Sequence, residues 1–186
     1  MPSCTAVTPH ALHHAACGCT KRLERRGLLA GLGALTALAA LPRGARAASG
    51  NYEAMLVNCI DPRFTSGCYS YMGEKHMRDR YSQFVIAGGP IGAVHPRFAP
   101  WHQAFWDNLD ITVALHNIQA VVALSHRDCG AAKLALGEAA VATPAAETAN
   151  HAEVLKAFRA EVARRKPALQ VVTGIMALDG SVETVT

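Results

Sequence analysis

Residues 118–132, IQAVVALSHRDCGAA, join an apolar run to a turn that holds two candidate metal ligands. The run is short and rich in strand-forming residues, which is typical of a buried strand. His126 and Cys129 follow it three positions apart, and a Gly/Ala-rich helical pattern comes next, over about residues 131–140. The stretch therefore predicts a strand, a tight turn with both side chains, and a helix that begins near Cys129.

The same order of strand, turn and helix recurs along the chain. Apolar runs at 54–60 (AMLVNCI) and 82–92 (SQFVIAGGPIG) each stop at a proline or at glycines, and LQVVTGIMAL at 169–178 is typical of a final strand. Two longer helices are expected over 101–117 and 147–166. Apolar strands that alternate with crossover helices predict an α/β fold, with a mostly parallel β-sheet flanked by α-helices.

The helix expected over 101–117 has an apolar face. Trp101, Phe105, Leu109 and Val113 recur every four residues, which places them on one side of a helix. A stripe of this kind is more typical of core packing than of a ligand platform. We therefore expect these four side chains to be buried against the sheet.

The first 47 residues have the composition of an export signal. The pair Arg25-Arg26 precedes the apolar residues 27–41, and Ala45-Arg46-Ala47 resembles a small-residue cleavage site. Paired arginines before a weakly hydrophobic run resemble a twin-arginine signal, and the run is shorter than the roughly 20 residues that span a bilayer. We expect a bacterial periplasmic or secreted protein with no stable membrane anchor after cleavage, and a single domain over 48–186.

The charge and cysteine content of residues 48–186 exclude several classes of protein. These residues contain 12 Lys and Arg against 13 Asp and Glu, a formal charge of −1, whereas the whole chain carries +4. No polybasic patch remains that would favour nucleic acid as a partner. Three cysteines remain, an odd number that argues against a disulfide framework.

Two of these cysteines follow strands that are expected to end at the same edge of the sheet. Cys59 closes the run at 54–60, and His126 and Cys129 close the run at 118–125. In parallel sheets of this type, ligands bind at the carboxyl ends of the strands. Side chains alternate along extended chain, so Cys59, Asp61 and Arg63 are expected on one side, with Pro62 favouring extended backbone at Asp61.

Two thiolates and one imidazole match the ligand set of a catalytic zinc site with one open position. Cys129 is expected at a helix start, where the partial positive charge favours the thiolate form. The fourth position is left to water or to Asp61. Cys68 lies in the polar stretch TSGCYSY, 65–71, and is interpreted as a loop residue.

The motifs CIDPR (59–63) and HRDCGAA (126–132) together resemble the zinc motifs of β-class carbonic anhydrases, and the resemblance extends over about residues 54–180. It implies that Cys59, His126 and Cys129 hold Zn²⁺ and that Asp61 and Arg63 form an orienting pair. The polar loop of the family is replaced here by Val85-Ile86-Ala87-Gly88-Gly89, which indicates a divergent, compact member. Gly88 and Gly130 are expected to line the substrate pocket.

The resemblance implies an enzyme, a zinc lyase that reversibly hydrates carbon dioxide to bicarbonate. Asp61 would orient the attacking water, while Arg63 holds the Asp61 carboxylate in place. If Arg63 released that carboxylate, Asp61 could bind the metal and occupy its open position. The resemblance also implies a homodimer or a higher homo-oligomer. Two alternatives remain open: hydrolysis of carbonyl sulfide or carbon disulfide at the same site, and a non-catalytic zinc or thiol redox module.

Overall fold

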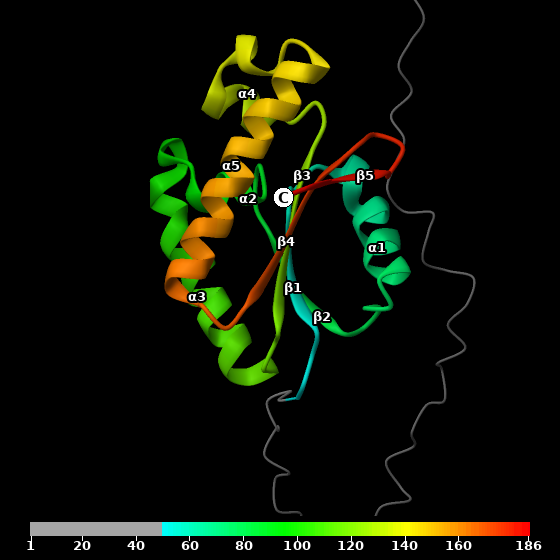
Figure 1. Ribbon diagram of the computed structural model, residues 1–186, viewed down its shortest axis with the longest axis vertical. Helices are drawn as coiled ribbons and strands as arrows, with labels where there is room; N and C mark the ends of the chain where they lie inside the picture. The colour runs from blue at the N-terminus through cyan, green and yellow to red at the C-terminus, as the bar shows by residue number, and fades with distance from the viewer. Residues whose placement is uncertain (1–49) are drawn as a thin grey trace, which may run out of the picture. The chain divides into compact units, whose positions relative to one another are not determined.

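The computed structural model describes residues 50–186, which form one five-stranded sheet with helices on both faces (Figure 1). The predicted export signal, residues 1–47, lies outside the described residues. The strands follow the order β2-β1-β3-β4-β5 across the sheet. The first four strands are parallel and the last is antiparallel to β4. Their bounds are β1 (Ala54–Asn58), β2 (Tyr81–Val85), β3 (Ala120–His126), β4 (Gln170–Met176) and β5 (Val182–Val185).

The helices are divided unequally between the two faces. Figure 1 shows α1 (Thr65–Glu74) alone on one side of the sheet, with α2, α3 and α5 on the other. The bounds of the remaining helices are α2 (Pro90–Val94), α3 (Ala99–His116), α4 (Gly130–Leu136) and α5 (Pro144–Arg165). Short 3-10 turns precede α1, α3 and α5, at Pro62–Phe64, Pro96–Phe98 and Glu138–Val141. The α/β fold with a mostly parallel sheet is thus confirmed.

The alternation of side chains along β1 explains why both faces are covered. Met55 and Val57 point into the core under α3 and α5, whereas Ala54 and Leu56 pack on the side of α1. All four are 2% exposed or less. A strand with apolar side chains on both sides needs a helix on each face, because either face would otherwise expose apolar area at a cost of about 25 cal/mol per Å².

Four expectations about individual elements were wrong. The helix expected over about 131–140 ends at Leu136, because Gly137 turns the chain with φ +89° and Glu138–Val141 form a separate 3-10 turn. The segment TSGCYSY, including Cys68, lies in helix α1, and the Cys68 side chain is buried against the sheet. The strand at β4 is followed by β5, which pairs back onto it across the turn at Asp179-Gly180. Helix α5 begins at Pro144, because the Thr143 hydroxyl accepts a hydrogen bond from the Ala146 N–H at 3.2 Å and caps the first turn.

The turn that follows β2 brings the chain back against β1. Gly89 has φ +55°, and a Cβ atom placed there would lie 2.9 Å from the Asn58 carbonyl carbon and 3.0 Å from the Cys59 nitrogen. Only glycine allows so close an approach. Within residues 50–186, no helix combines the length and the apolarity needed to cross a membrane.

Candidate metal centre

Cys59, His126 and Cys129 lie together at the carboxyl ends of β1 and β3. The two strands are parallel neighbours, with Val57 opposite Ala123, so their ends reach the same edge of the sheet. One ligand atom from each of the three residues lies within 4.8 Å of the other two, and all three residues are buried. Segments separated by almost 70 positions therefore present two sulfurs and a ring nitrogen to one point.

The His126 ring has one nitrogen engaged and one free. Its Nδ1 lies 2.8 Å from the Arg127 carbonyl oxygen, which requires Nδ1 to carry the proton and to donate. Its Nε2 is buried and has no hydrogen-bond partner. The ring is also held by Phe64, whose centroid lies 4.0 Å away. A fixed imidazole with a bare, buried Nε2 is the state that a metal ligand adopts.

The surroundings of the two thiols favour the charged form of Cys59. The pKa of Cys59 is lowered to about 4, because the Cys129 thiol donates a hydrogen bond to it; burial opposes this, and His126 and the backbone N–H groups of Asp61 and Gly88 add to it. The Gly88 N–H lies 3.2 Å from the Cys59 Sγ. The same hydrogen bond, together with burial, raises the pKa of Cys129. The site thus stabilises a thiolate in a buried position, where a metal cation would be attracted.

Burial by itself lowers the pKa of His126, but the closeness of Cys59 and the hydrogen bond to the Arg127 carbonyl raise it above the usual value. A proton and a metal cation are both drawn to this cluster by the same negative charge. Metal binding would therefore displace protons from the ligand residues.

Asp61 and Arg63 lie beside the cluster and bind each other. The Asp61 carboxylate accepts hydrogen bonds from Arg63 Nη2 at 2.7 Å, from Nε at 3.1 Å and from the Arg63 backbone N–H at 3.0 Å. The expected alternation past Asp61 was wrong, because Pro62–Phe64 form a 3-10 turn that Asp61 caps. The turn folds Arg63 back onto Asp61, and the guanidinium hydrogen bond lowers the pKa of the Asp61 carboxyl to about 2.

Two acidic residues that sequence reasoning missed hold the second motif in place. Asp128 binds Arg63 Nη1 at 2.9 Å, and the buried Glu147 accepts the Asp128 backbone N–H at 2.7 Å. Asp128 could have been noticed, because it stands inside the HRDC motif. Glu147 carried no signal, because it comes from helix α5 and meets the motif only in the folded chain.

The two glycines predicted for a substrate pocket have different surroundings. Gly88, at φ +78°, lies against both Cys59 and the start of α4, where an added Cβ would come 3.0 Å from Ala131 Cβ. An added Cβ at Gly130 would meet nothing within 4 Å. Gly88 is therefore at the cluster and Gly130 faces open space next to Cys129, while their contact with a substrate stays a prediction.

An apolar pocket of about 500 Å³ lies between Ile60, the end of β2 and the start of α3. Ile60 and Ala87, which line it, are the chain neighbours of Cys59 and Gly88. Its walls are Ile60, Val85, Ile86, Ala87, Pro100, Trp101 and Ala104. The expectation that Trp101 is buried in the core was wrong. Trp101 lies in the first turn of α3, where it lines this pocket and stacks on Phe98, and it is 39% exposed.

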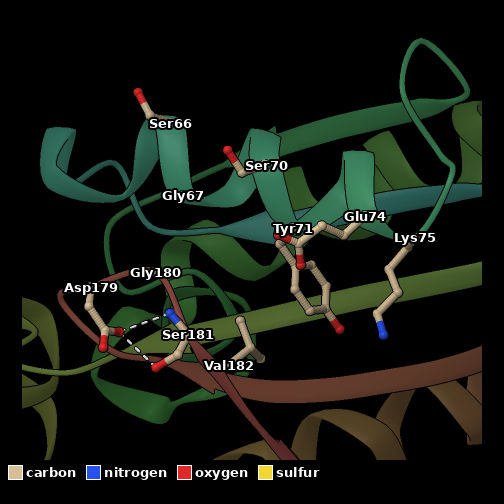
Figure 2. Close-up of a pocket in the computed structure, with 10 residues that line it drawn as sticks. All are labelled: Ser66, Gly67, Ser70, Tyr71, Glu74, Lys75, Asp179, Gly180, Ser181 and Val182. Carbon is tan, nitrogen blue, oxygen red and sulfur yellow. Dashed lines mark hydrogen bonds between the residues drawn. The ribbon is translucent and has the colours of Figure 1, made fainter.

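A second, polar pocket of about 580 Å³ lies between α1 and the turn that joins β4 to β5. Figure 2 shows Ser66 and Ser70 along the helix and Asp179 in the turn, with Asp179 accepting two hydrogen bonds from Ser181. None of its lining residues belongs to the Cys-His-Cys cluster. The pocket is thus separate from the candidate metal centre.

Comparison by sequence finds relatives whose activity is not named. The uncharacterized protein RC0076 of Rickettsia conorii is 31% identical over 131 residues, which cover 70% of this chain and 70% of that protein. An uncharacterized protein of Rickettsia bellii is 30% identical over 131 residues, 70% of this chain and 80% of that protein. No protein-family model matches the chain.

Comparison by structure finds β-carbonic anhydrases. Isoform I from Trichomonas vaginalis aligns with a TM-score of 0.51 at 15% identity, covering 74% of this chain and 84% of that one. CafA of Aspergillus fumigatus gives 0.50 at 17% identity, with coverages of 73% and 76%. The Coccomyxa enzyme in complex with acetazolamide gives 0.50 at 15% identity, with coverages of 74% and 73%. At these identities the likeness establishes the fold.

Proposed function

The chain belongs to the same family as the Rickettsia conorii protein RC0076, and we propose that it is a zinc enzyme that reversibly hydrates carbon dioxide to bicarbonate. The observation that carries the proposal is the buried group of Cys59, His126 and Cys129, whose ligand atoms lie within 4.8 Å of one another. The fold shared with β-carbonic anhydrases supports it.

The residues present fit a zinc ion. Two sulfurs and one imidazole nitrogen are ligands that zinc prefers, and three protein ligands leave one of its four tetrahedral positions open. His126 offers a buried Nε2 with no other partner, and Cys59 is stabilised as a thiolate. When bound, zinc would lower the pKa of a water molecule toward neutrality and so supply hydroxide near pH 7.

Asp61 and Arg63 would orient the attacking water. The Asp61 carboxylate is ionised and keeps acceptor capacity beyond its bonds to Arg63, so it can accept a hydrogen from that water and direct a lone pair at the carbon. Arg63 holds the carboxylate in a bidentate pair, with Nε donating to Oδ1 and Nη2 donating to Oδ2, which limits its rotation. Asp61 and Arg63 would thus set the orientation of the attacking water, while the metal and its ligands would set the pKa of that water.

The apolar pocket supports a small nonpolar substrate. Carbon dioxide has no charge and no hydrogen-bond donor, and the pocket that includes Ile60, the residue after Cys59, is lined by aliphatic side chains and Trp101. Water is held weakly by such a surface, so a nonpolar gas can displace it at little cost. Carbonyl sulfide is also a small, linear and uncharged molecule, so it belongs in the same assay.

The test combines metal analysis with stopped-flow carbon dioxide hydration of the purified protein. We expect one zinc per chain and hydration that Cys59→Ser abolishes together with zinc binding. Cys68→Ser is the matched control, since Cys68 is an equally buried thiol in α1 that lies outside the cluster. One zinc with no turnover of carbon dioxide or carbonyl sulfide would overturn the enzymatic proposal, and a metal-free protein with a Cys59–Cys129 disulfide would favour a redox module.

We also propose that the protein is exported and acts as a homodimer or a higher homo-oligomer. Support for assembly comes from large apolar side chains exposed around the edge strand β2: Ile60 is 62% exposed and Val85 is 47% exposed. An apolar patch at an uncovered sheet edge is typical of an interface. Export rests on the composition of residues 1–47 alone.

A further inference from the structure

Asp128 joins the two halves of the candidate site through its carboxylate. Arg63 donates from Nη1 to Asp128 Oδ2 at 2.9 Å and from Nη2 to the Asp128 carbonyl oxygen at 3.2 Å. Lys133 donates to the other carboxylate oxygen, Oδ1, at 2.7 Å. Each oxygen of Asp128 thus has its own cation, one from the first motif and one from α4.

The backbone at Asp128 adopts a conformation that glycine would accept more readily. Its φ is +54°, in the left-handed region, where a side chain costs about 1–2 kcal/mol. Its N–H donates to Glu147 Oε1 at 2.7 Å, a contact that does not involve the Asp128 side chain. Aspartate is one of the few residues besides glycine that adopt this conformation routinely, so the role of the side chain is inferred from its ion pairs with Arg63 and Lys133.

The role of the Asp128 carboxylate follows from the contacts that hold the Asp61 carboxylate in place. All the hydrogen bonds that the structure gives to the Asp61 carboxylate come from Arg63. Asp61 is two residues from Cys59, and a carboxylate is itself a zinc ligand, so an unrestrained Asp61 would compete for the open position. Arg63 restrains it only while the guanidinium stays fixed, and the second anchor of that guanidinium is Asp128.

We propose that Asp128 is a positioning residue, which holds Arg63 in its pose over Asp61 and so keeps the Asp61 carboxylate off the open metal position. The proposal rests on the proposed zinc site. It predicts that loss of the Asp128 carboxylate makes the open position less accessible to an added ligand, although Asp128 does not reach that position itself.

The test uses substitutions that suit left-handed backbone. Asp128→Gly removes the carboxylate and relaxes the backbone, and Asp128→Asn keeps an acceptor while removing the charge. Asp79 is the matched control, since it has φ +59° and makes no side-chain hydrogen bond or ion pair within residues 50–186. Asp79→Gly and Asp79→Asn therefore repeat both chemical changes away from the site.

The measurement is thiocyanate affinity of the cobalt-substituted protein, followed by the visible absorption of the metal. Arg63 and Asp128 are about half exposed, so we expect a modest effect: about fivefold weaker thiocyanate binding in Asp128→Gly, the size of a loss of about 1 kcal/mol. Asp128→Asn should fall between this variant and the wild type. Both Asp79 variants should bind thiocyanate as the wild type does.

A double-substitution cycle separates positioning from general damage. In an Asp61→Asn background the amide competes poorly for the metal, so Asp128→Gly should cause no loss of thiocyanate affinity there. Equal affinity in Asp128→Gly and wild type, or the same loss with and without Asp61, would overturn this inference while leaving the zinc site standing. A wild-type protein that takes up no cobalt with thiolate charge-transfer absorption would overturn the proposed function and the inference together.

Discussion

Asp61 is controlled by its immediate neighbours in the chain. Pro62 favours extended backbone at Asp61, which has φ −60° and ψ 119°, and the 3-10 turn that begins at Pro62 returns Arg63 to the carboxylate. The pair is therefore assembled within three residues, at the end of a buried strand. The consequence is an ionised carboxylate with a fixed direction next to the Cys59 thiolate.

Asp61→Asn should retain zinc and lose most carbon dioxide hydration. The amide keeps the size of the side chain but has one acceptor oxygen in place of two and no charge for Arg63, so the orientation of the water is lost. We expect a fall of about 100-fold in kcat/KM, the lower end of what a positioned proton acceptor contributes. Asp179→Asn, in the polar pocket of Figure 2, should keep both zinc and activity. Full activity in Asp61→Asn would remove this residue from the mechanism.

Residues of the site could be predicted to the extent that their geometry is local. Cys59 and His126 follow apolar strands directly, so the rule that parallel strands end at one edge brings them together. Glu147 could not be predicted, because its contact with Asp128 depends on how α5 packs on the sheet. Cys68 was placed in a loop because TSGCYSY contains serine, threonine and glycine, which are weak helix formers.

At the scale of elements, α1 illustrates how packing overrides local preference. Its apolar residues Cys68 and Met72 are four positions apart and both are buried on the sheet, which gives the helix one apolar face. Burial of that face outweighs the weak helix propensity of the segment. Strand β5 was missed for a related reason: its four residues form a strand only because β4 is there to pair with them.

The glycine turn after β2 positions Cys59, and Gly89→Ala tests this. The new Cβ would press on the backbone of Asn58 and Cys59, so we expect a loss of about 1–3 kcal/mol in unfolding free energy beyond the backbone strain, and weaker zinc binding. Gly137→Ala is the control, because Gly137 also has positive φ, +89°, but an added Cβ there meets nothing within 4 Å. Denaturant unfolding and zinc titration of both variants provide the measurement. Equal destabilisation with unchanged zinc affinity would contradict the account.

At the scale of the whole molecule, a buried histidine ties stability to pH. His151 in α5 is fully buried, and neither ring nitrogen has a hydrogen-bond partner. Its pKa is lowered to about 4, mainly by burial. The nearby Glu147 opposes this shift, and His126 and Arg127 add to it. The folded state therefore keeps His151 neutral at a pH where the unfolded chain already binds a proton.

This difference predicts a loss of stability as the pH falls from about 6.5 to about 4. In that window the unfolded state binds more protons than the folded state, so the unfolding free energy should drop by about 3 kcal/mol from this residue and level off below it. His151→Leu removes the titration and should lower the pH sensitivity by that amount relative to the wild type. Denaturant unfolding at pH 7 and pH 4.5 measures it, and identical pH sensitivity in the two proteins would refute the assignment.

Assembly is the second property of the whole molecule that can be tested. Val85→Glu places a charge in the exposed apolar patch at the β2 edge and should convert an oligomer to monomers. Leu178→Glu is the control, since Leu178 is 61% exposed after β4, away from that edge. Light scattering after size exclusion gives the mass of each variant. An oligomer that persists in Val85→Glu would place the interface elsewhere. A monomeric wild type would exclude assembly.

We propose that two sulfurs and one imidazole from distant segments bind a single zinc ion and leave its fourth position for a ligand that binds through oxygen or nitrogen. X-ray absorption at the zinc edge of the purified protein tests this directly. We expect two sulfur atoms at about 2.3 Å and two nitrogen or oxygen atoms at about 2.0–2.2 Å, one of the latter from His126. A shell of three or four sulfurs, or zinc bound without sulfur, would contradict it.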